Sequence, residues 1–153
     1  MAERRVYVAV IGASQASREE LEQAHAAGRR LAELGAIVVT GGRGGVMEAA
    51  CRGAKDGGGQ TLGILPGLDR SDANAYVDIS LPTGLGELRN GLVARAADAV
   101  VAVGGAWGTL AEIAFARAAG KPVFGVGSWQ LGEDGVVAVG SGIEAADRAA
   151  AAA

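Results

Sequence analysis

The sequence predicts a Rossmann-like α/β domain that is doubly wound, with a mainly parallel sheet and helices on both faces. Its apolar runs are short and rich in Val and Ile, which is typical of strands buried on both sides. Segments with helical spacing of small and apolar residues separate these runs. The alternation predicts βαβ units within a single domain over residues 1–153. Ligands of such sheets bind at the carboxyl ends of the strands.

The first half of the chain has the pattern βαβαβ. Its first helix has apolar residues on one face, including Leu21 and Leu31, and Gly35 ends it. Three consecutive glycines follow the second helix, and Pro66 ends the third strand. The expected elements are strands Val6–Ile11, Ile37–Thr40 and Thr61–Leu65, and helices Ser17–Leu34 and Val46–Ala54.

The second half opens with a less regular stretch, Gly67–Gly86, which we expect to be a mobile or substrate-facing loop. It contains a candidate short strand, Tyr76–Ser80, before Pro82. Regular alternation then resumes. The expected elements are helices Glu87–Ala96, Thr109–Ala119 and Ile143–Ala153, and strands Ala99–Val103, Pro122–Val126 and Val136–Val139.

Composition excludes several function classes. A net charge of −3 and a pI near 5.2 give no electrostatic footprint for nucleic acid or for an anionic membrane. With one histidine and one cysteine, the chain cannot build a multi-histidine metal cage or an internal disulfide. No apolar run approaches the roughly 20 residues that span a bilayer. We therefore expect a cytoplasmic protein without a metal or a resident cofactor.

Glycines gather after three of the predicted strands. A helix that starts directly after glycines leaves backbone N–H groups free beside the positive end of its dipole, which suits a phosphate. The same glycines could simply make tight turns, but two such loops at one sheet edge favour an anion site. The candidates are Gly41, Gly42, Gly44 and Gly45 after the second strand, and Gly104, Gly105 and Gly108 after the strand that ends at Val103.

The two standard nucleotide fingerprints are absent. No Gly-Lys-Ser or Gly-Lys-Thr follows these loops, and Gly120-Lys121-Pro122 lies at the wrong end of a helix. The chain has no G-x-G-x-x-G spacing, and Thr40-Gly41-Gly42 stands where a dinucleotide enzyme places an acidic residue. NAD binding and kinase-type use of ATP are therefore not expected.

Three segments taken together resemble the LOG (LONELY GUY-like) family and its PGGxGTxxE motif. They are the run from Gly41 to Ala50, the pair Arg89-Asn90, and the run from Gly104 to Glu112. The chain looks most similar to the short branch labelled molybdenum-cofactor-carrier-like or "possible lysine decarboxylase". No lysine stands in a setting suited to pyridoxal phosphate, so decarboxylation is set aside. The resemblance implies a homodimer or higher homo-oligomer that releases the base from nucleoside 5′-monophosphates.

The resemblance also implies a catalytic pair, Arg89 and Glu112. Here Asn90 replaces the family's lysine and Val103 its proline. A carboxylate can stabilise the oxocarbenium character of a breaking N-glycosidic bond, and a guanidinium can hold the phosphate or the departing base. Two alternatives stay open. Thr109-x-x-Glu112 is also a capping box, and Arg89 could be a solvated residue paired with Glu87 or Asp98.

The other candidate ligand contacts are Ser14, Met47, Trp107 and Thr109. Ser14 could instead cap the first helix and Met47 could belong to the core, whereas Trp107 could stack on a base or a pterin. The sequence thus predicts a site for a small phosphorylated, nucleotide-like ligand. LOG-type hydrolysis is the main hypothesis, a non-catalytic nucleotide or molybdopterin-cofactor carrier is the alternative, and a homodimeric scaffold is the third.

Overall fold

The computed structural model describes residues 3–132 and 134–153. Within these ranges seven parallel strands form one sheet in the order β4-β3-β2-β1-β5-β6-β7. The strands are β1 (Tyr7–Gly12), β2 (Ile37–Thr40), β3 (Thr61–Leu65), β4 (Ile79–Pro82), β5 (Ala99–Val103), β6 (Val123–Val126) and β7 (Val137–Val139). The helices are α1 (Arg18–Glu33), α2 (Val46–Asp56), α3 (Arg89–Ala96), α4 (Trp107–Ala118) and α5 (Gly142–Ala152). None of the helices described is long and apolar enough to cross a membrane.

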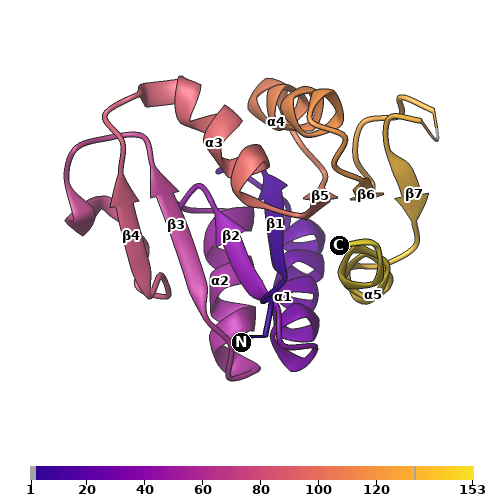
Figure 1. Ribbon diagram of the computed structural model, residues 1–153, viewed down its shortest axis with the longest axis horizontal. Coiled ribbons are helices and arrows are strands. Elements are labelled where there is room, and N and C mark those ends of the chain that lie inside the picture. The colour runs from indigo at the N-terminus through magenta and orange to yellow at the C-terminus, as the bar shows by residue number, and fades with distance from the viewer. Residues whose placement is uncertain (1–2, 133) are drawn as a thin grey trace.

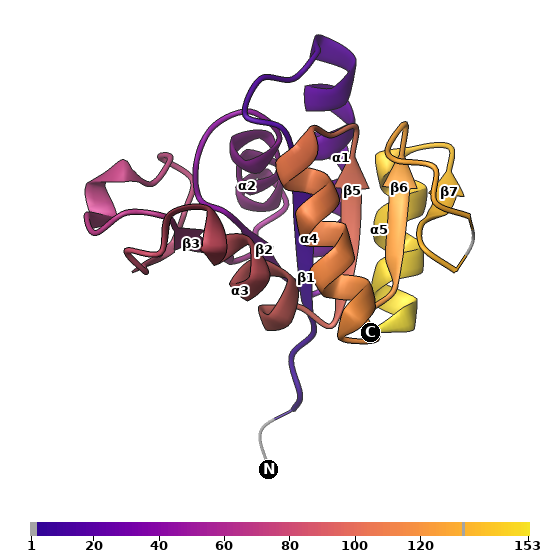
Figure 2. The same ribbon diagram turned by 90° about the horizontal axis from the view of Figure 1, so that it is seen from above.

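The chain winds outward from the middle of the sheet twice, once in each direction. From β1 it runs to the edge strand β4, and it then returns through α3 to β5, which pairs with β1. Helices α1, α2 and α5 cover one face of the sheet and α3 and α4 cover the other (Figures 1 and 2). The predicted single-domain, doubly wound α/β fold is therefore confirmed. Its switch point lies between β1 and β5, where Gly12 pairs with Val103.

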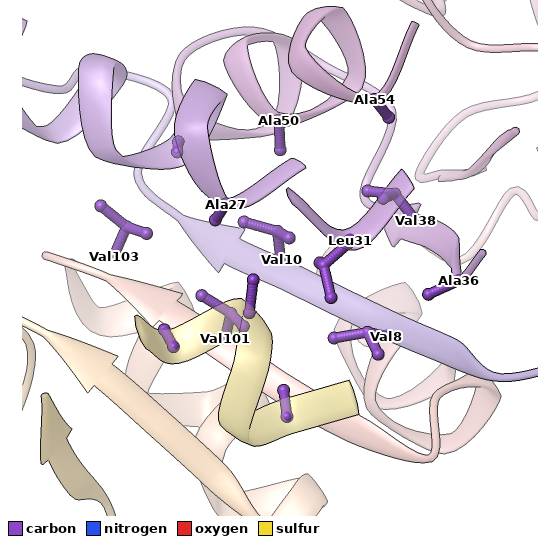
Figure 3. Packing of buried hydrophobic residues seen from close by; sticks show 14 of the residues in the cluster. Val8, Val10, Ala27, Leu31, Ala36, Val38, Ala50, Ala54, Val101 and Val103 are labelled. Atoms are coloured by element: carbon purple, nitrogen blue, oxygen red, sulfur yellow. The ribbon is translucent and has the colours of Figure 1, made fainter. Parts of the chain in front are cut away.

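Two apolar layers hold the helices on the sheet. Alternate valines of the central strands, among them Val8, Val10 and Val101, point toward the small side chains of α1, α2 and α5 (Figure 3). Those helices carry alanines at the contact, so their axes come close to the sheet and to one another. Gly28 of α1 lies so near α2 that a Cβ there would collide with the carbonyl oxygen of Ala50. Close helix packing therefore accounts for glycines that have no place in the predicted anion site.

Several predicted boundaries need correction. The short strand near residue 80 spans Ile79–Pro82 instead of Tyr76–Ser80. It is an edge strand, so one of its sides has no neighbouring strand. Proline, which lacks an N–H, is tolerated at such a position because no backbone hydrogen bond between strands is lost there. A 3₁₀ turn, Gly86–Leu88, precedes α3, so this helix begins at Arg89. Helix α4 begins at Trp107, two residues before the predicted start.

Candidate functional site

A cavity of about 630 Å³ lies at the carboxyl edge of the sheet, beside the switch point between β1 and β5. Four chain segments from different parts of the sequence line it. They are Gly12, Ala13, Ser14 and Gln15 after β1, Arg43 and Met47 at the start of α2, Arg89 and Asn90 at the start of α3, and Ala106, Gly108, Thr109 and Glu112 in and before α4. The place is the one that a doubly wound sheet offers to a ligand.

Glu112 is a buried carboxyl group at this cavity, with 8% of its surface exposed. Burial raises its pKa to about 8, and the nearby charge of Arg89 lowers this pKa by a smaller amount. Within the described chain the Glu112 side chain takes part in no hydrogen bond and in no direct ion pair with Arg89. At pH 7 the carboxyl is therefore mostly protonated and can donate a hydrogen bond into the cavity.

Arg89 is half-buried and held by carbonyl groups of the neighbouring strands. Its Nε donates to the carbonyl oxygen of Ile64 at 2.9 Å, and its Nη2 donates to that of Gly41 at 3.3 Å. Its Nη1 donates to the Oδ1 of Asn90. Burial lowers the pKa of Arg89, the charge of Glu112 opposes this shift, and the charge of Arg43 adds to it. The guanidinium is thus fixed in direction, and most of its donors are already used.

Arg43 brings a second positive charge to the cavity. It lies in the turn between β2 and α2, and its side chain is exposed. The main chain of this turn is tied to the loop after β3, because Asn74 donates its N–H to the Gly42 carbonyl at 2.9 Å and its Nδ2 to the Arg43 carbonyl at 2.8 Å. With Glu112 neutral, two guanidinium groups leave the cavity positively charged at pH 7, which suits an anionic ligand.

The starts of the helices settle two of the alternatives. Because α4 begins at Trp107, Thr109 lies in its first turn, and the Thr109 hydroxyl accepts a bond from the N–H of Ala106 at 3.3 Å. The capping role considered for Glu112 is therefore wrong. Ser17, in a capping box with Glu20, caps α1, so the capping role of Ser14 is also wrong.

The pairing considered for Arg89 with Glu87 or Asp98 is wrong as well. The carboxylate of Asp98 accepts bonds from Arg4 at 3.1 Å and from the N–H of Tyr7 at 3.0 Å. The Arg89 guanidinium instead reaches the strand carbonyls described above. These contacts direct Arg89 toward the sheet edge and away from solvent.

The structure brings about half of the predicted site residues together. Those that line the cavity are Ser14, Met47, Arg89, Gly108, Thr109 and Glu112. Gly41 lies behind the guanidinium of Arg89, and the remaining loop glycines Gly42, Gly44 and Gly45 shape the turn outside the lining. Gly104 and Gly105 line a neighbouring hollow of about 320 Å³. Trp107 is exposed and lies against Trp129, with ring centroids 5.3 Å apart and ring planes inclined by 38°.

Sequence reasoning missed six lining residues. Arg43 had a visible signal, since it is the one charged residue within the glycine run 41–45. Asn90 departs from the family pattern, but its contact with Arg89 depends on side-chain geometry. The others, which are Gly12, Ala13, Gln15 and Ala106, adjoin predicted residues and carry no chemical signal of their own.

Known proteins resemble the chain over most of its length. The Moco carrier protein of Chlamydomonas reinhardtii is 36% identical to this chain, and the match covers 95% of each of the two chains with a TM-score of 0.86. The molybdenum cofactor binding protein of Rippkaea orientalis is 35% identical, with 92% of this chain and 93% of that chain covered and a TM-score of 0.85. A protein of Archaeoglobus fulgidus is 40% identical over 116 residues, which is 76% of each chain.

These relatives agree with the expected molybdenum-cofactor-carrier-like branch, whereas the LOG motif itself stays a prediction. The sequence model of the SLOG cluster4 family matches residues 5–150. That match spans nearly the whole chain and all four segments that line the cavity. The chain therefore belongs to the SLOG cluster4 family.

Proposed function

We propose that this protein binds and carries a phosphorylated small molecule of pterin or nucleotide type, and that its cargo is the molybdenum cofactor. The observation that carries the proposal is the buried Glu112 carboxyl, which faces a positively charged cavity and has no hydrogen-bond partner among the described residues. No fully buried side-chain oxygen or nitrogen among the described residues lacks a hydrogen-bond partner, so the Glu112 carboxyl oxygens must be reached from the cavity, where a polar ligand can hydrogen-bond to them. Arg43, Arg89 and the first turn of α4 supply groups that suit a phosphate.

The protonation state of Glu112 favours holding a ligand over cleaving one. Stabilising an oxocarbenium ion requires a carboxylate, but a pKa of about 8 leaves most of this group neutral at pH 7. A neutral carboxyl is a hydrogen-bond donor and suits a carbonyl, a ring nitrogen or a phosphate oxygen of the ligand. Most of the N–H donors of Arg89 are bound to oxygen atoms of the protein. Arg89 therefore contributes a positive charge at a fixed position, and it has few donors left to bind a ligand directly.

The nature of the cargo is supported by the relatives. Proteins that are 35% and 36% identical over nearly the whole chain bind or carry the molybdenum cofactor, which is a phosphorylated pterin. A cavity of about 630 Å³ lies within the range of small-molecule sites, roughly 300–1,000 Å³. A cytoplasmic location is part of the proposal, and the buried free thiol of Cys51 is consistent with it.

The test is transfer of the cofactor to the purified protein. Cofactor released from a molybdoenzyme is mixed with the chain without oxygen, and unbound material is removed by gel filtration. The bound fraction is measured as pterin fluorescence after oxidation and as molybdenum by mass spectrometry. We expect about one bound cofactor per protein chain, and a much smaller bound fraction for the Arg43→Ala variant. Retention equal to that of an unrelated acidic protein would overturn the proposal.

A phosphoribohydrolase is the second candidate, because Arg89 and Glu112 do line one cavity. If the ionised carboxyl does the chemistry, release of adenine from AMP must increase as the pH rises through the pKa of about 8. Glu112→Gln must abolish that increase. A carrier releases no base at any pH between 6 and 9.

We also propose that the chain forms a homodimer through the outer face of α3 and α4. Leu88, the last residue of the 3₁₀ turn before α3, is 72% exposed. Leu92 of α3 follows it by about one helical turn and is 40% exposed. Phe115 of α4, 45% exposed, lies against Gly91, the chain neighbour of Leu92. We propose that these three exposed side chains together form the contact surface, hereafter the α3–α4 patch. A two-fold dimer uses the same surface on both subunits, so this one patch can lie at the centre of its interface.

A further inference from the structure

We infer that Trp107, Trp129 and the hollow beside them bind the planar fused ring of the ligand, while the cavity around Arg43, Arg89 and Glu112 binds its phosphate. This inference rests on the proposed function and adds to it a division of the ligand between two subsites. The ligand class is a phosphate ester that carries a bicyclic heteroaromatic ring, either a pterin or a purine.

The aromatic pair is built as a fixed platform. Trp129 packs on the apolar layer beneath α3 and α4, and its indole Nε1 donates to the carbonyl oxygen of Ala106 at 3.2 Å. Trp107 lies against this anchored ring, with centroids 5.3 Å apart and ring planes inclined by 38°. Trp107 nevertheless has 76% of its surface exposed. The exposed surface of Trp107 therefore leaves room for a second ring to stack on the indole.

The platform adjoins the phosphate cavity through one short segment. Gly104 and Gly105 line the hollow of about 320 Å³, together with Ser128, Trp129 and Gln130 of the loop after β6. Ala106 and Gly108, on either side of Trp107, line the larger cavity. A ligand that passes over residues 104–108 would thus reach both hollows.

Two further bonds fix the loop after β6 on this segment. The Ser128 hydroxyl donates to the carbonyl oxygen of Gly104 at 2.6 Å, and the N–H of Gly104 donates to the Val126 carbonyl at 3.0 Å. These bonds tie the floor of the smaller hollow to residues 104–108. At this hollow, the side-chain amide of Gln130 offers both a donor and an acceptor. Purines and pterins carry adjacent donors and acceptors on one ring edge, so this amide can pair with them.

The two tryptophans are the only ones in the chain, so intrinsic fluorescence reports on this platform directly. Guanosine 5′-monophosphate and neopterin monophosphate are compared with ribose 5-phosphate, which has the phosphate and no ring. Affinities are measured by calorimetry and quenching by fluorescence. We expect the ring-bearing ligands to quench and to bind about tenfold more tightly, as stacking on one indole predicts. Tighter binding of guanosine 5′-monophosphate would indicate a purine ligand, and tighter binding of neopterin monophosphate would indicate a pterin.

Trp107→Ala should remove the tenfold advantage while leaving the affinity for ribose 5-phosphate unchanged. Ile143→Ala is the control, since Ile143 is an exposed apolar residue of α5 that lines neither hollow and lies outside the α3–α4 patch. Equal affinity of ring-bearing and ring-free ligands, or an unchanged advantage in Trp107→Ala, overturns the ring subsite and leaves phosphate binding intact. If none of the three ligands binds, the carrier function and the ring subsite both fail.

Discussion

Arg89, at the start of α3, and Glu112, in the second turn of α4, line the same cavity without forming an ion pair in the described part of the chain. Burial raises the pKa of Glu112 more than the charge of Arg89 lowers it. The result is a neutral carboxyl beside a fixed guanidinium at pH 7. Such a pair can donate hydrogen bonds to an anion from both members, which a salt bridge could not do.

Glu112 should make the stability of the protein depend on pH. In the folded state its pKa is raised from 4.5 to about 8, so the folded protein retains a proton that the unfolded chain releases between these values. The free energy of unfolding must therefore decrease as the pH rises through this window, by at most about 1.4 kcal/mol per pH unit. Urea unfolding between pH 5.5 and 8.5 measures the slope.

Glu112→Gln, which keeps a neutral side chain of the same size, should flatten this profile. Glu87→Gln serves as its control, because Glu87 is exposed in the 3₁₀ turn before α3. A Glu112→Gln variant with the wild-type slope would contradict the assignment of the buried proton.

The two arginines of the cavity should respond differently to removal. Arg43 is exposed and its role is electrostatic, so Arg43→Ala should weaken binding of ribose 5-phosphate about tenfold and leave the free energy of unfolding unchanged. Arg89→Ala should weaken binding and also destabilise the fold by about 1–3 kcal/mol, because the Ile64 and Gly41 carbonyls lose their donor. Calorimetry and urea unfolding separate the two effects. Equal destabilisation by both variants would be inconsistent with the hydrogen bonds seen for Arg89.

The fold was predictable because strands that are buried on both faces appear in the sequence as short apolar runs. The valine-rich strand β5, for example, is wholly buried, and Ala99–Val103 was predicted with its observed bounds. The edge strand was misplaced because Ile79 and Leu81 are exposed, so no buried pattern marks it. The glycine loops at the strand ends lie at the edge of the sheet that also holds the cavity.

The composition of the site was less predictable, because it depends on contacts between distant segments. The hydrogen bonds between Arg89 and Asn90, and between the Ala106 N–H and the Thr109 hydroxyl, depend on where α3 and α4 begin. Local sequence predicts the first residue of a helix only to within about one turn. The loop glycines were predicted to bind phosphate. Several of them also bring elements close together; a Cβ at Gly45, for example, would collide with the carbonyl oxygen of Ala13.

Gly28 should be indispensable for the packing of α1 on α2. A methyl group there would strike the Ala50 carbonyl, so Gly28→Ala should destabilise the fold by about 1–3 kcal/mol despite the better helix propensity of alanine. Gly44→Ala is the control, since a Cβ at Gly44 meets nothing closer than the Glu48 carboxylate at 4.0 Å. Thermal unfolding of the two variants tests this, and equal midpoints would show that the helices can separate without cost.

Leu92 should be required for dimer formation if the α3–α4 patch is the interface. Leu92→Glu places a charge in the middle of an apolar contact, where it would be desolvated without a partner in both subunits. We expect a dimer for the wild type and a monomer with an unchanged fold for the variant, measured by light scattering after gel filtration and by circular dichroism. Leu34→Glu changes a leucine of similar exposure at the end of α1, away from the patch, and should remain a dimer. A wild-type protein that stays monomeric at high concentration, or a Leu92→Glu protein that still dimerises, would exclude this face. Because α3 carries both Leu92 and Arg89, measuring ribose 5-phosphate binding in the same variant also shows whether the cavity depends on the interface.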